Sequence, residues 1–525
     1  MSAPITNSQA ELPRVVRMFS NPRAYDHPVD SIEVVETHIS WVFLTGAFAY
    51  KVKKPVKLPF VDFSTLARRR DACGDEVRLN RRLAPSLYVG VVTMGGTETA
   101  PKIHGTPLFE YAVKMRQFNS DLRLDRQLAA GSIAPDQVCA FAAGLAEFHA
   151  ALPPLSMART SASDEAFAAF IGNLAELESQ LEADESARLE SIRTWFNGQR
   201  AMLAAVLNER SSLGFVRECH GDLHLENLVL LENEITAFDA LEFSERLRQI
   251  DLIDEVGFLV MDFVAHKRRD LAYMFLNCYL EETGDYPGLR LITYYMIYRA
   301  LVRAKVRKIR QHQVGPSEIG DRETGDSEGY LRLGIELGGV TKPLLLITRG
   351  LSGSGKTHVS QALIPELPAI RVRSDIERKR LFGLAPGAES GSGLGTGIYA
   401  SKLSDETYAV LERFAAAALE ANLNVIIDAS FLKKSMREIF RSLADDRGAD
   451  FIVLNCQAPA AVLRERVAQR KTAGLDASEA TVAVLNHQMG NAEPLDESEH
   501  DHSIEVDTTT PVDIESLVER IGRKR

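Results

Sequence analysis

The segment from Gly350 to Thr357 reads Gly-Leu-Ser-Gly-Ser-Gly-Lys-Thr and directly follows an apolar run at 344–347. Its spacing is G-x-x-x-x-G-K-[ST], which binds phosphate when a strand precedes it and a helix follows it. Glycines let backbone N–H groups surround an anion, and the helix beginning near Lys356 directs its positive end at the same place. We expect a nucleoside triphosphate site in which Lys356 also serves catalysis and Thr357 ligates Mg²⁺. A flexible glycine turn is the alternative. The residues expected to contact the nucleotide are Gly350, Ser352, Gly353, Ser354, Gly355, Lys356 and Thr357.

A second motif lies upstream, where residues 220–227 read His-Gly-Asp-Leu-His-Leu-Glu-Asn and an apolar stretch follows that ends in Phe238-Asp239. This spacing resembles the catalytic loop and metal-binding aspartate of protein-kinase-like proteins, in the form found in aminoglycoside phosphotransferases and related small-molecule kinases. The resemblance implies that Asp222 accepts the proton of the acceptor hydroxyl and that Asn227 and Asp239 hold Mg²⁺. The two histidines have a simpler interpretation, in which they brace the loop by hydrogen bonds.

Composition sets limits on the class of protein. The chain has 525 residues, enough for roughly three to four domain units of ordinary size. Apolar residues make up 45% and charged residues 25%, as in globular proteins. The formal charge of −11 argues against a protein that coats nucleic acid or an anionic membrane, although a local basic groove stays compatible with it.

Cysteine usage and the N-terminus indicate the compartment. The five cysteines are scattered and lack C-x-x-C spacing, so we expect neither a disulfide framework nor a zinc site, as in a reducing cytoplasm. The first 20 residues lack an apolar core, and no stretch approaches 18 uncharged apolar residues. The sequence therefore predicts a cytoplasmic protein without a membrane partner.

A break in composition divides the chain, because the segment 311–329 combines many glycines with many charges and cannot bury much apolar surface. We expect an α+β bilobal kinase-like N-terminal domain and an α/β P-loop NTPase C-terminal domain with a parallel sheet. The apolar piece Tyr330–Leu337 either leads into the second domain or packs back onto the first. The predicted divisions are an N-terminal extension at 1–30, an aminoglycoside phosphotransferase-like domain at 31–337 with a flexible linker at 311–329, and a P-loop kinase domain at 338–525.

The first domain reads as strands followed by helices. Two β-rich runs, 41–44 and 47–52, are separated by Thr45-Gly46 as a hairpin turn, and from Pro135 onward nearly everything has helical periodicity. A small β-lobe followed by a larger α-lobe is the order that a kinase-like fold requires.

That fold also needs a lysine on its third strand and a glutamate on the next helix. Ala49-Tyr50-Lys51 resembles this strand, so Lys51 is the candidate for contact with the α- and β-phosphates, and Glu76 is its expected ion-pair partner. Lys53 faces the same side of a strand and competes for the role. Alternatively, these lysines, with Lys54 and Lys57, form a solvated basic edge.

Other charged residues near the first motif have less specific interpretations. Asp251 and Asp254 either brace the catalytic loop or cap a helix, and Glu242 is a candidate auxiliary metal ligand. The arginines along 299–310 are expected on a solvated helix face, with a groove for an anionic substrate as the alternative.

In the second domain, strand-like runs alternate with helical ones, which predicts a parallel sheet with ligands at the carboxyl ends of its strands. Asp375 and Asp428 fall at two such ends. Their segments resemble the small P-loop kinases grouped as AAA-33, related to zeta-toxin and polynucleotide-kinase proteins. The resemblance implies Asp375 as the base, or as the group that positions the acceptor hydroxyl, and Asp428 as a group that orients Mg²⁺.

Arg466 and Arg470 share a helix face, and the same resemblance makes them lid arginines that contact the nucleotide. A surface helix with Glu465 as counter-ion is the alternative. The glycine-rich segment 387–397 is either a loop that closes over substrate or a disordered insertion.

These features predict an ATP- and Mg²⁺-dependent phosphotransferase with two modules, each acting on a hydroxyl of a small molecule. One alternative is a regulatory ATP-binding protein with a single catalytic module. Another is a C-terminal polynucleotide 5′-hydroxyl kinase, which the acidic balance disfavours without excluding nucleic acid. Fold does not fix the acceptor, and the segments expected to line the acceptor pockets carry no motif that names it.

Overall fold

The computed structural model describes residues 12–58, 61–155, 161–181, 183–314, 327–339, 341–388, 390, 401–473 and 478–525. Within these ranges, only the backbone is described for residues 183–187, 310–314, 401–402 and 470–473. The chain packs as two compact units. Unit 1 contains Met1–Arg159, Arg210–Leu259 and Val306–Thr324, and unit 2 contains Thr160–Glu209, Val260–Lys305 and Gly325–Arg525.

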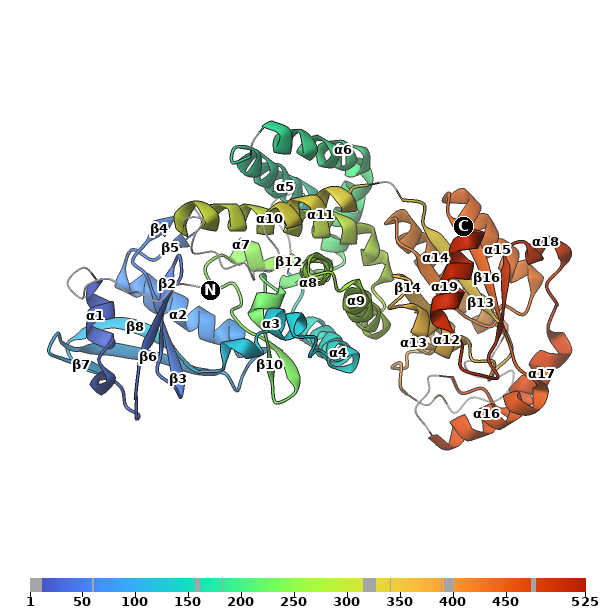
Figure 1. Ribbon diagram of the computed structural model, residues 1–525, viewed down its shortest axis with the longest axis horizontal. Coiled ribbons are helices and arrows are strands. Elements are labelled where there is room, and N and C mark those ends of the chain that lie inside the picture. The colour runs from blue at the N-terminus through green and yellow to red at the C-terminus, as the bar shows by residue number, and fades with distance from the viewer. Residues whose placement is uncertain are drawn as a thin grey trace. The chain divides into compact units, whose positions relative to one another are not determined.

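Unit 1 is built on a six-stranded antiparallel sheet of order β1-β2-β3-β8-β6-β7. Its elements, drawn in Figure 1, are α1 (Arg14–Phe19), β1 (Glu33–Glu36), β2 (Ser40–Leu44), β3 (Phe48–Lys53), β4 (Lys57–Leu58), β5 (Val61–Asp62), α2 (Leu66–Asn80), β6 (Tyr88–Thr97), β7 (Ala100–Ile103), β8 (Leu108–Arg116), α3 (Leu124–Ala129), α4 (Pro135–Ala151), β9 (Val216–Glu218), β10 (Leu228–Leu231), β11 (Glu234–Ala237), α7 (Glu245–Arg248) and β12 (Gln249–Asp251). Three helices run through both units: α6 (Ala183–Ser212), α8 (Leu252–Ala265) and α10 (Leu289–Val314).

The sheet follows from alternating burial and from a tight turn. Trp41 and Phe43 of β2 point into the core, and Gly46 supplies the left-handed φ of +91° between β2 and β3. The predicted hairpin at Thr45-Gly46 is therefore confirmed. Apolar residues of α1, including Val16 and Phe19, belong to the same core cluster as the sheet.

The other face of the sheet packs against α2. Cys73 and Val77 of α2 share a core cluster with Ala49 of β3 and Val113 of β8. This packing fixes α2 against β3, the strand that carries the candidate lysines. Short strands interrupt the expected helical region: β9 pairs with β12, and β10 pairs with β11, in two antiparallel two-stranded sheets.

Unit 2 combines a group of helices with a five-stranded parallel sheet of order β14-β15-β13-β16-β17. Its elements are α5 (Ala162–Glu178), α9 (Arg269–Thr283), α11 (Ser327–Leu337), β13 (Leu344–Arg349), α12 (Lys356–Leu363), β14 (Ile370–Arg373), α13 (Ser374–Leu381), α14 (Ser401–Glu420), β15 (Val425–Asp428), α15 (Lys434–Asp446), β16 (Asp450–Gln457), α16 (Ala460–Ala473), α17 (Val482–Asn491), α18 (Glu497–His500), β17 (Ser503–Asp507) and α19 (Ile514–Lys524). The central strand β13 reads Leu-Leu-Leu-Ile-Thr-Arg and is buried over its first five residues, as expected for a strand covered on both faces.

The predicted fold class is confirmed by these two sheets, one antiparallel and followed by helices, the other parallel and alternating with helices. The piece Tyr330–Leu337 lies in α11 and packs back onto preceding helices. Its Tyr330 Oη donates to Asp262 Oδ1 over 2.6 Å, and Gly334 lies against Ala300. The predicted linker and the glycine-rich segment 387–397 fall largely outside the described residues.

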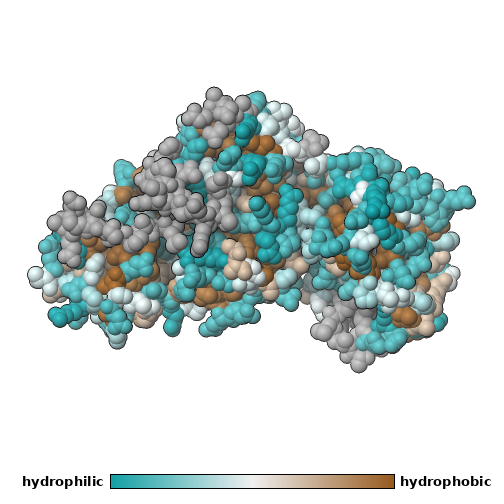
Figure 2. All heavy atoms as spheres, in the orientation of Figure 1, coloured by the Kyte–Doolittle hydropathy of each residue, from teal (hydrophilic) through white to brown (hydrophobic). Residues whose placement is uncertain are grey.

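The cysteine prediction was wrong for two residues, because Cys139 and Cys278 are disulfide-bonded, whereas Cys73, Cys219 and Cys456 are free and buried. None of the described helices is both long and apolar enough to cross a bilayer. On the face drawn in Figure 2, hydrophilic residues cover most of the surface and hydrophobic residues show between them in scattered groups.

Candidate active sites

The site of unit 1 centres on Glu76 of α2, which lies between two lysines of β3. Lys51 Nζ is 2.9 Å from Glu76 Oε1 and 2.5 Å from Asp239 Oδ1. Lys53 Nζ is 2.5 Å from Glu76 Oε2 and also pairs with Glu242. The structure thus places Lys51, not Lys53, beside Asp239. Because both lysines are largely buried, the alternative of a solvated basic edge is wrong for them.

Burial and charge oppose each other in this cluster. Burial alone would raise the pKa of Glu76, but Lys51 and Lys53 outweigh it and lower the pKa to about 2. Burial would lower the pKa of Lys51, yet Asp239 and Glu76 raise it well above its ordinary value. Glu76 and Lys51 are therefore both charged at neutral pH. Glu242 is engaged by Lys53, so its carboxylate serves the ion-pair cluster instead of standing ready as an auxiliary metal ligand.

The 220–227 loop brings Asp222 and Asn227 together. Asn227 Nδ2 donates to Asp222 Oδ2 over 2.9 Å and to the Asp222 carbonyl over 3.0 Å. His224 Nδ1 accepts from the Glu226 amide and so caps the short 3₁₀ turn at 225–227 that presents Asn227. The Asn227 amide holds one carboxylate oxygen of Asp222 and keeps its own oxygen for another ligand.

The loop is braced from behind by Glu255, which sequence reasoning did not single out. Its Oε2 accepts from the amides of His220 and Gly221 over 2.8 and 3.1 Å. His220 is buried, and its Nε2 lies 2.9 Å from the Phe238 carbonyl, in keeping with the bracing interpretation. For Asp251 the capping alternative holds, because its Oδ1 accepts from the Ile253 amide at the start of α8 over 2.9 Å.

Asp239 is positioned through its backbone. It has a left-handed φ of +61°, its amide donates to Tyr88 Oη over 3.1 Å, and the next amide, of Ala240, donates to Asn80 Oδ1 over 2.8 Å. Tyr88 belongs to β6 of the sheet, and Asn80 belongs to α2, which packs on the sheet. The Asp239 side chain is 41% exposed, so its free oxygen can reach a metal ion.

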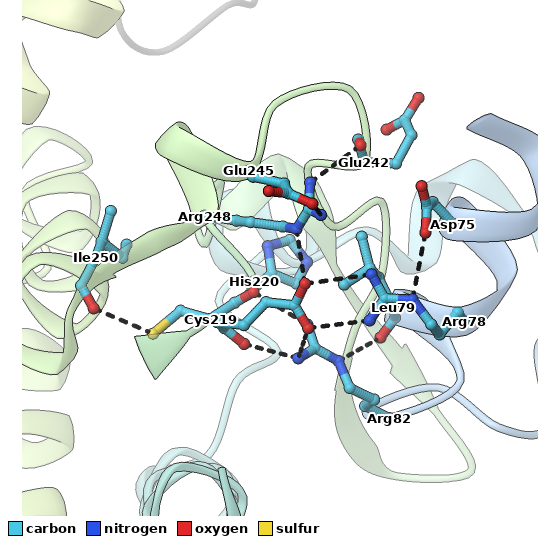
Figure 3. Close-up of polar contacts among 12 residues, drawn as sticks. Asp75, Arg78, Leu79, Arg82, Cys219, His220, Glu242, Glu245, Arg248 and Ile250 are labelled. Carbon is cyan, nitrogen blue, oxygen red and sulfur yellow. Dashed lines mark hydrogen bonds and ion pairs between the residues drawn. The ribbon is translucent and has the colours of Figure 1, made fainter. Parts of the chain in front are cut away.

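Three arginines, one in α2, one just after it and one in α7, pair with the residue at the end of β9, shortly before the 220–227 loop. Figure 3 shows Arg78, Arg82 and Arg248 converging on one place. All three form ion pairs with the Glu218 carboxylate. Arg78 Nη1 lies 2.9 Å and Arg248 Nε 3.0 Å from it. Burial would raise the pKa of Glu218, but the hydrogen bonds from Arg78 and Arg248 dominate and lower it to about 2. The helix that carries Glu76 is thereby joined to the loop that carries Asp222.

The predicted arginine face at 299–310 is wrong for its described members. Arg299, Arg303 and Arg307 are buried, and Arg307 pairs with Glu226 in unit 1. Helical spacing alone gave no sign of this burial.

In unit 2, the loop 350–357 has the geometry of a phosphate cradle. Gly350, Gly353 and Gly355 have left-handed φ values of +153°, +84° and +82°. A Cβ on Gly350 would lie 2.4 Å from Ser354 Oγ, and one on Gly353 would lie 2.9 Å from the Leu463 carbonyl. Lys356 Nζ folds back to the Leu351 carbonyl over 2.9 Å. The glycines are therefore required by space as well as by conformation.

One cavity of about 1400 Å³ joins this loop to the carboxylates at the strand ends. Lys356, Thr357, Asp375 and Asp428 all line it. The adjacent strands β14 and β15 are in register at Arg373 and Asp428, which explains why both acidic groups reach the same space. Asp428 Oδ2 accepts from Ser360 Oγ of α12 over 3.1 Å.

Arg466 of α16 reaches the 350–357 loop. It donates to the Gly353 carbonyl over 3.3 Å, to Thr508 Oγ1 over 3.1 Å and to the Thr508 carbonyl over 2.5 Å. Thr508 Oγ1 in turn donates to the Ser354 carbonyl over 3.0 Å. The side chain of Arg470 lies outside the described residues.

Gln488 also contacts this loop, and no sequence motif predicted it. The Ser352 amide, in the phosphate loop, donates to Gln488 Oε1 of α17 over 2.8 Å. The side-chain oxygen of Gln488 therefore occupies the position beside the Ser352 amide that a bound anion would take.

A family model described as an AAA domain, AAA_33, matches residues 345–495, which confirms the predicted AAA-33-like domain. The uncharacterized protein Rv2004c of Mycobacterium tuberculosis is 30% identical over 468 residues, covering 87% of this chain and 91% of Rv2004c. The chain belongs to the Rv2004c family. Mb2027c of Mycobacterium bovis, another uncharacterized protein of the Rv2004c family, matches with the same identity and coverage. Among solved structures, the chain is similar to a choline/ethanolamine kinase family protein from Mesorhizobium loti, at 15% identity and a TM-score of 0.38, over 63% of this chain and 95% of that one.

Proposed function

We propose that this protein is an ATP-dependent phosphotransferase with two modules, each of which moves a γ-phosphoryl group to a hydroxyl of a small molecule. The observation that carries the proposal is that two constellations of the same chemical kind stand in one chain. In the first, Lys51 pairs with Glu76 and Asp239, and Asn227 pairs with the candidate base Asp222. In the second, Lys356, Thr357, Asp375 and Asp428 line one cavity.

In the first module, Asp222 accepts the proton of the acceptor hydroxyl, and Asn227 holds that carboxylate in place through Nδ2. Asn227 Oδ1 and the exposed oxygen of Asp239 are hard donors of the type that Mg²⁺ prefers. The ion would supply charge neutralisation for the transferred group. Lys51, fixed by Glu76, contacts the α- and β-phosphates.

In the second module, the amides of residues 350–357 and Lys356 bind the phosphates, and Arg466 offsets charge that develops during transfer. Asp375 orients or deprotonates the acceptor hydroxyl. The side-chain oxygens of Thr357 and Asp428 line the same cavity and are of the type that would hold Mg²⁺.

The test uses the full-length protein, labelled ATP and a panel of hydroxylated metabolites. Asp222→Ala and Lys356→Ala are each expected to reduce a different activity by roughly 10²-fold or more. If either substitution removes both activities, the chain has one site. If only one activity exists, a regulatory protein with a single catalytic module is the better account. Transfer to 5′-hydroxyl oligonucleotides that depends on Lys356 would instead identify a polynucleotide kinase.

A further inference from the structure

The outer edge of β14 is completed by a side chain from α9. Asn277 Nδ2 donates to the Ala369 carbonyl over 2.9 Å, and the Arg371 amide donates to Asn277 Oδ1 over 2.6 Å. Asn277 is only 2% exposed. Its amide offers one donor and one acceptor, the pair that a neighbouring strand would supply. One side chain therefore takes the place of a sixth strand at this edge.

One turn further along α9, Glu281 holds two arginines of the same strand. Arg371 Nη2 lies 2.7 Å from Glu281 Oε1, and Arg373 Nη1 lies 3.5 Å from Glu281 Oε2. Arg371 is buried, while Arg373 lines the cavity that contains the phosphate loop. The carboxylate thus connects the helix to a group inside the candidate site.

The far end of α13 is attached to α9 as well. Arg380 donates to the carbonyls of Glu281 over 2.6 Å and Glu282 over 3.2 Å, at the C-terminal end of α9, where a cation is favoured. Gly284 ends that helix with a φ of +71°, and a Cβ there would lie 2.7 Å from Arg380 Nε. The strand β14 before Asp375 and the helix α13 that contains Asp375 are therefore both fixed to α9.

We propose that α9 contributes two positioning residues, Asn277 and Glu281, to the P-loop site. These residues fix the positions of Arg373 and Asp375 on the acceptor side. The inference rests on the proposed function of the second module. A shift of about 1 Å in a reacting group costs roughly 10²-fold in rate. The rate should therefore differ measurably between protein in which α9 fixes residues 370–381 and protein in which it does not. The phosphate loop is built by other elements and does not depend on these contacts.

The experiment uses full-length protein carrying Asp222→Asn, so that only the second module turns over. Three substitutions are made one at a time in this parent protein: Asn277→Ala, the milder Asn277→Asp, and Glu281→Gln. Glu282→Gln is the matched control, because Glu282 is the next residue of the same helix and its side chain is exposed. Three quantities are measured: hydrogen exchange of residues 370–381, the dissociation constant for ATP, and turnover of ATP with water as acceptor.

We expect Asn277→Ala to raise amide exchange at 370–381 at least tenfold while β13 is unchanged. Turnover should fall at least fivefold for Asn277→Ala and Glu281→Gln, with the ATP dissociation constant within about twofold of the parent. The control should match the parent. A loss of turnover with intact nucleotide affinity is the signature that general destabilisation does not give.

Three results would overturn the inference: unchanged exchange at 370–381, raised exchange with unchanged turnover, or a parallel loss of nucleotide affinity and turnover. Failure of the proposed function looks different. In that case the parent shows no turnover that Lys356→Ala removes, whereas the exchange measurement still decides whether α9 holds the segment.

Discussion

The two candidate sites are built in different ways. In unit 1, the lysines, Glu76 and Asp239 come from three elements far apart in sequence, and side-chain ion pairs join them. In unit 2, the site is built on the consecutive residues 350–357, whose glycines have left-handed conformations, and Lys356 folds back on the same loop. A network of charged side chains is vulnerable to the loss of one member, whereas a backbone cradle is vulnerable to an added atom. The following predictions concern the site of unit 1, first by loss of a charged member and then by an added atom.

The largest effect is expected for Lys53→Met, which leaves the buried carboxylate of Glu242 without its ion-pair partner. Removing one partner of a buried pair costs about 3–5 kcal/mol in the free energy of unfolding. Lys51→Met should cost less stability, because Lys51 is nearer solvent, but it should weaken ATP binding roughly 10- to 100-fold.

Stability is measured by urea unfolding followed through Trp41, in protein carrying Trp195→Phe, since the chain has two tryptophans. ATP binding is measured by calorimetry in the Lys356→Ala background. The double substitution Lys53→Met with Glu242→Met should recover part of the loss. Equal effects of the two lysines on nucleotide affinity would remove the distinction between them.

A smaller effect is expected for Gly221→Ala, an added atom in the side-chain site. Gly221 has a φ of +84°, and a Cβ would lie 3.0 Å from the backbone of Arg248. The left-handed conformation costs about 1–2 kcal/mol. Displacement of Arg248 adds to this and should lower first-module turnover at least tenfold.

Gly131→Ala is the matched control, with a φ of +69° and open space around the new atom. It should show the conformational cost alone and normal turnover. If the two alanine variants behave alike, close packing behind the catalytic loop is unimportant.

The smallest effect is a pH dependence at Glu218, whose folded pKa is about 2 against an ordinary 4.5. A depressed carboxyl pKa stabilises the fold above pH 4.5, and this stabilisation is lost as the pH falls toward 2. Glu218→Gln should therefore cost about 1–2 kcal/mol at pH 7 and on the order of 1 kcal/mol less at pH 3.5, after allowance for solvent screening. Unfolding monitored through Trp41 at both pH values is the measurement, with exposed Glu234→Gln as control. A cost that does not change with pH would contradict the assigned ion pairs.

The phosphate loop could be predicted from sequence because its function lies in consecutive residues. The strand before it, the helix after it and the carboxylates at neighbouring strand ends follow from simple periodicity, and all lie around one cavity. Lys51 and Glu76 could be proposed from spacing, but only tertiary packing separated Lys51 from Lys53.

Other residues gave no signal in the sequence. Glu255, Gln488 and Asn277 act through contacts with backbone amides, and such contacts depend on where a distant segment lies. The helical arginines misled for a related reason: the spacing of charges along a helix shows which of them share a face, not whether that face is buried.

The pairing of the Asn277 side chain with β14 affects whether the P-loop domain can fold apart from the rest of the chain. A fragment of residues 338–525 would lack α9 and expose the Ala369 carbonyl and the Arg371 amide at a bare sheet margin. Unpaired margins of this kind recruit strands from other molecules. The segment 338–525 alone is therefore poorly suited to transfer between genes, and a recombinant fragment should stay monodisperse only when α9 is included.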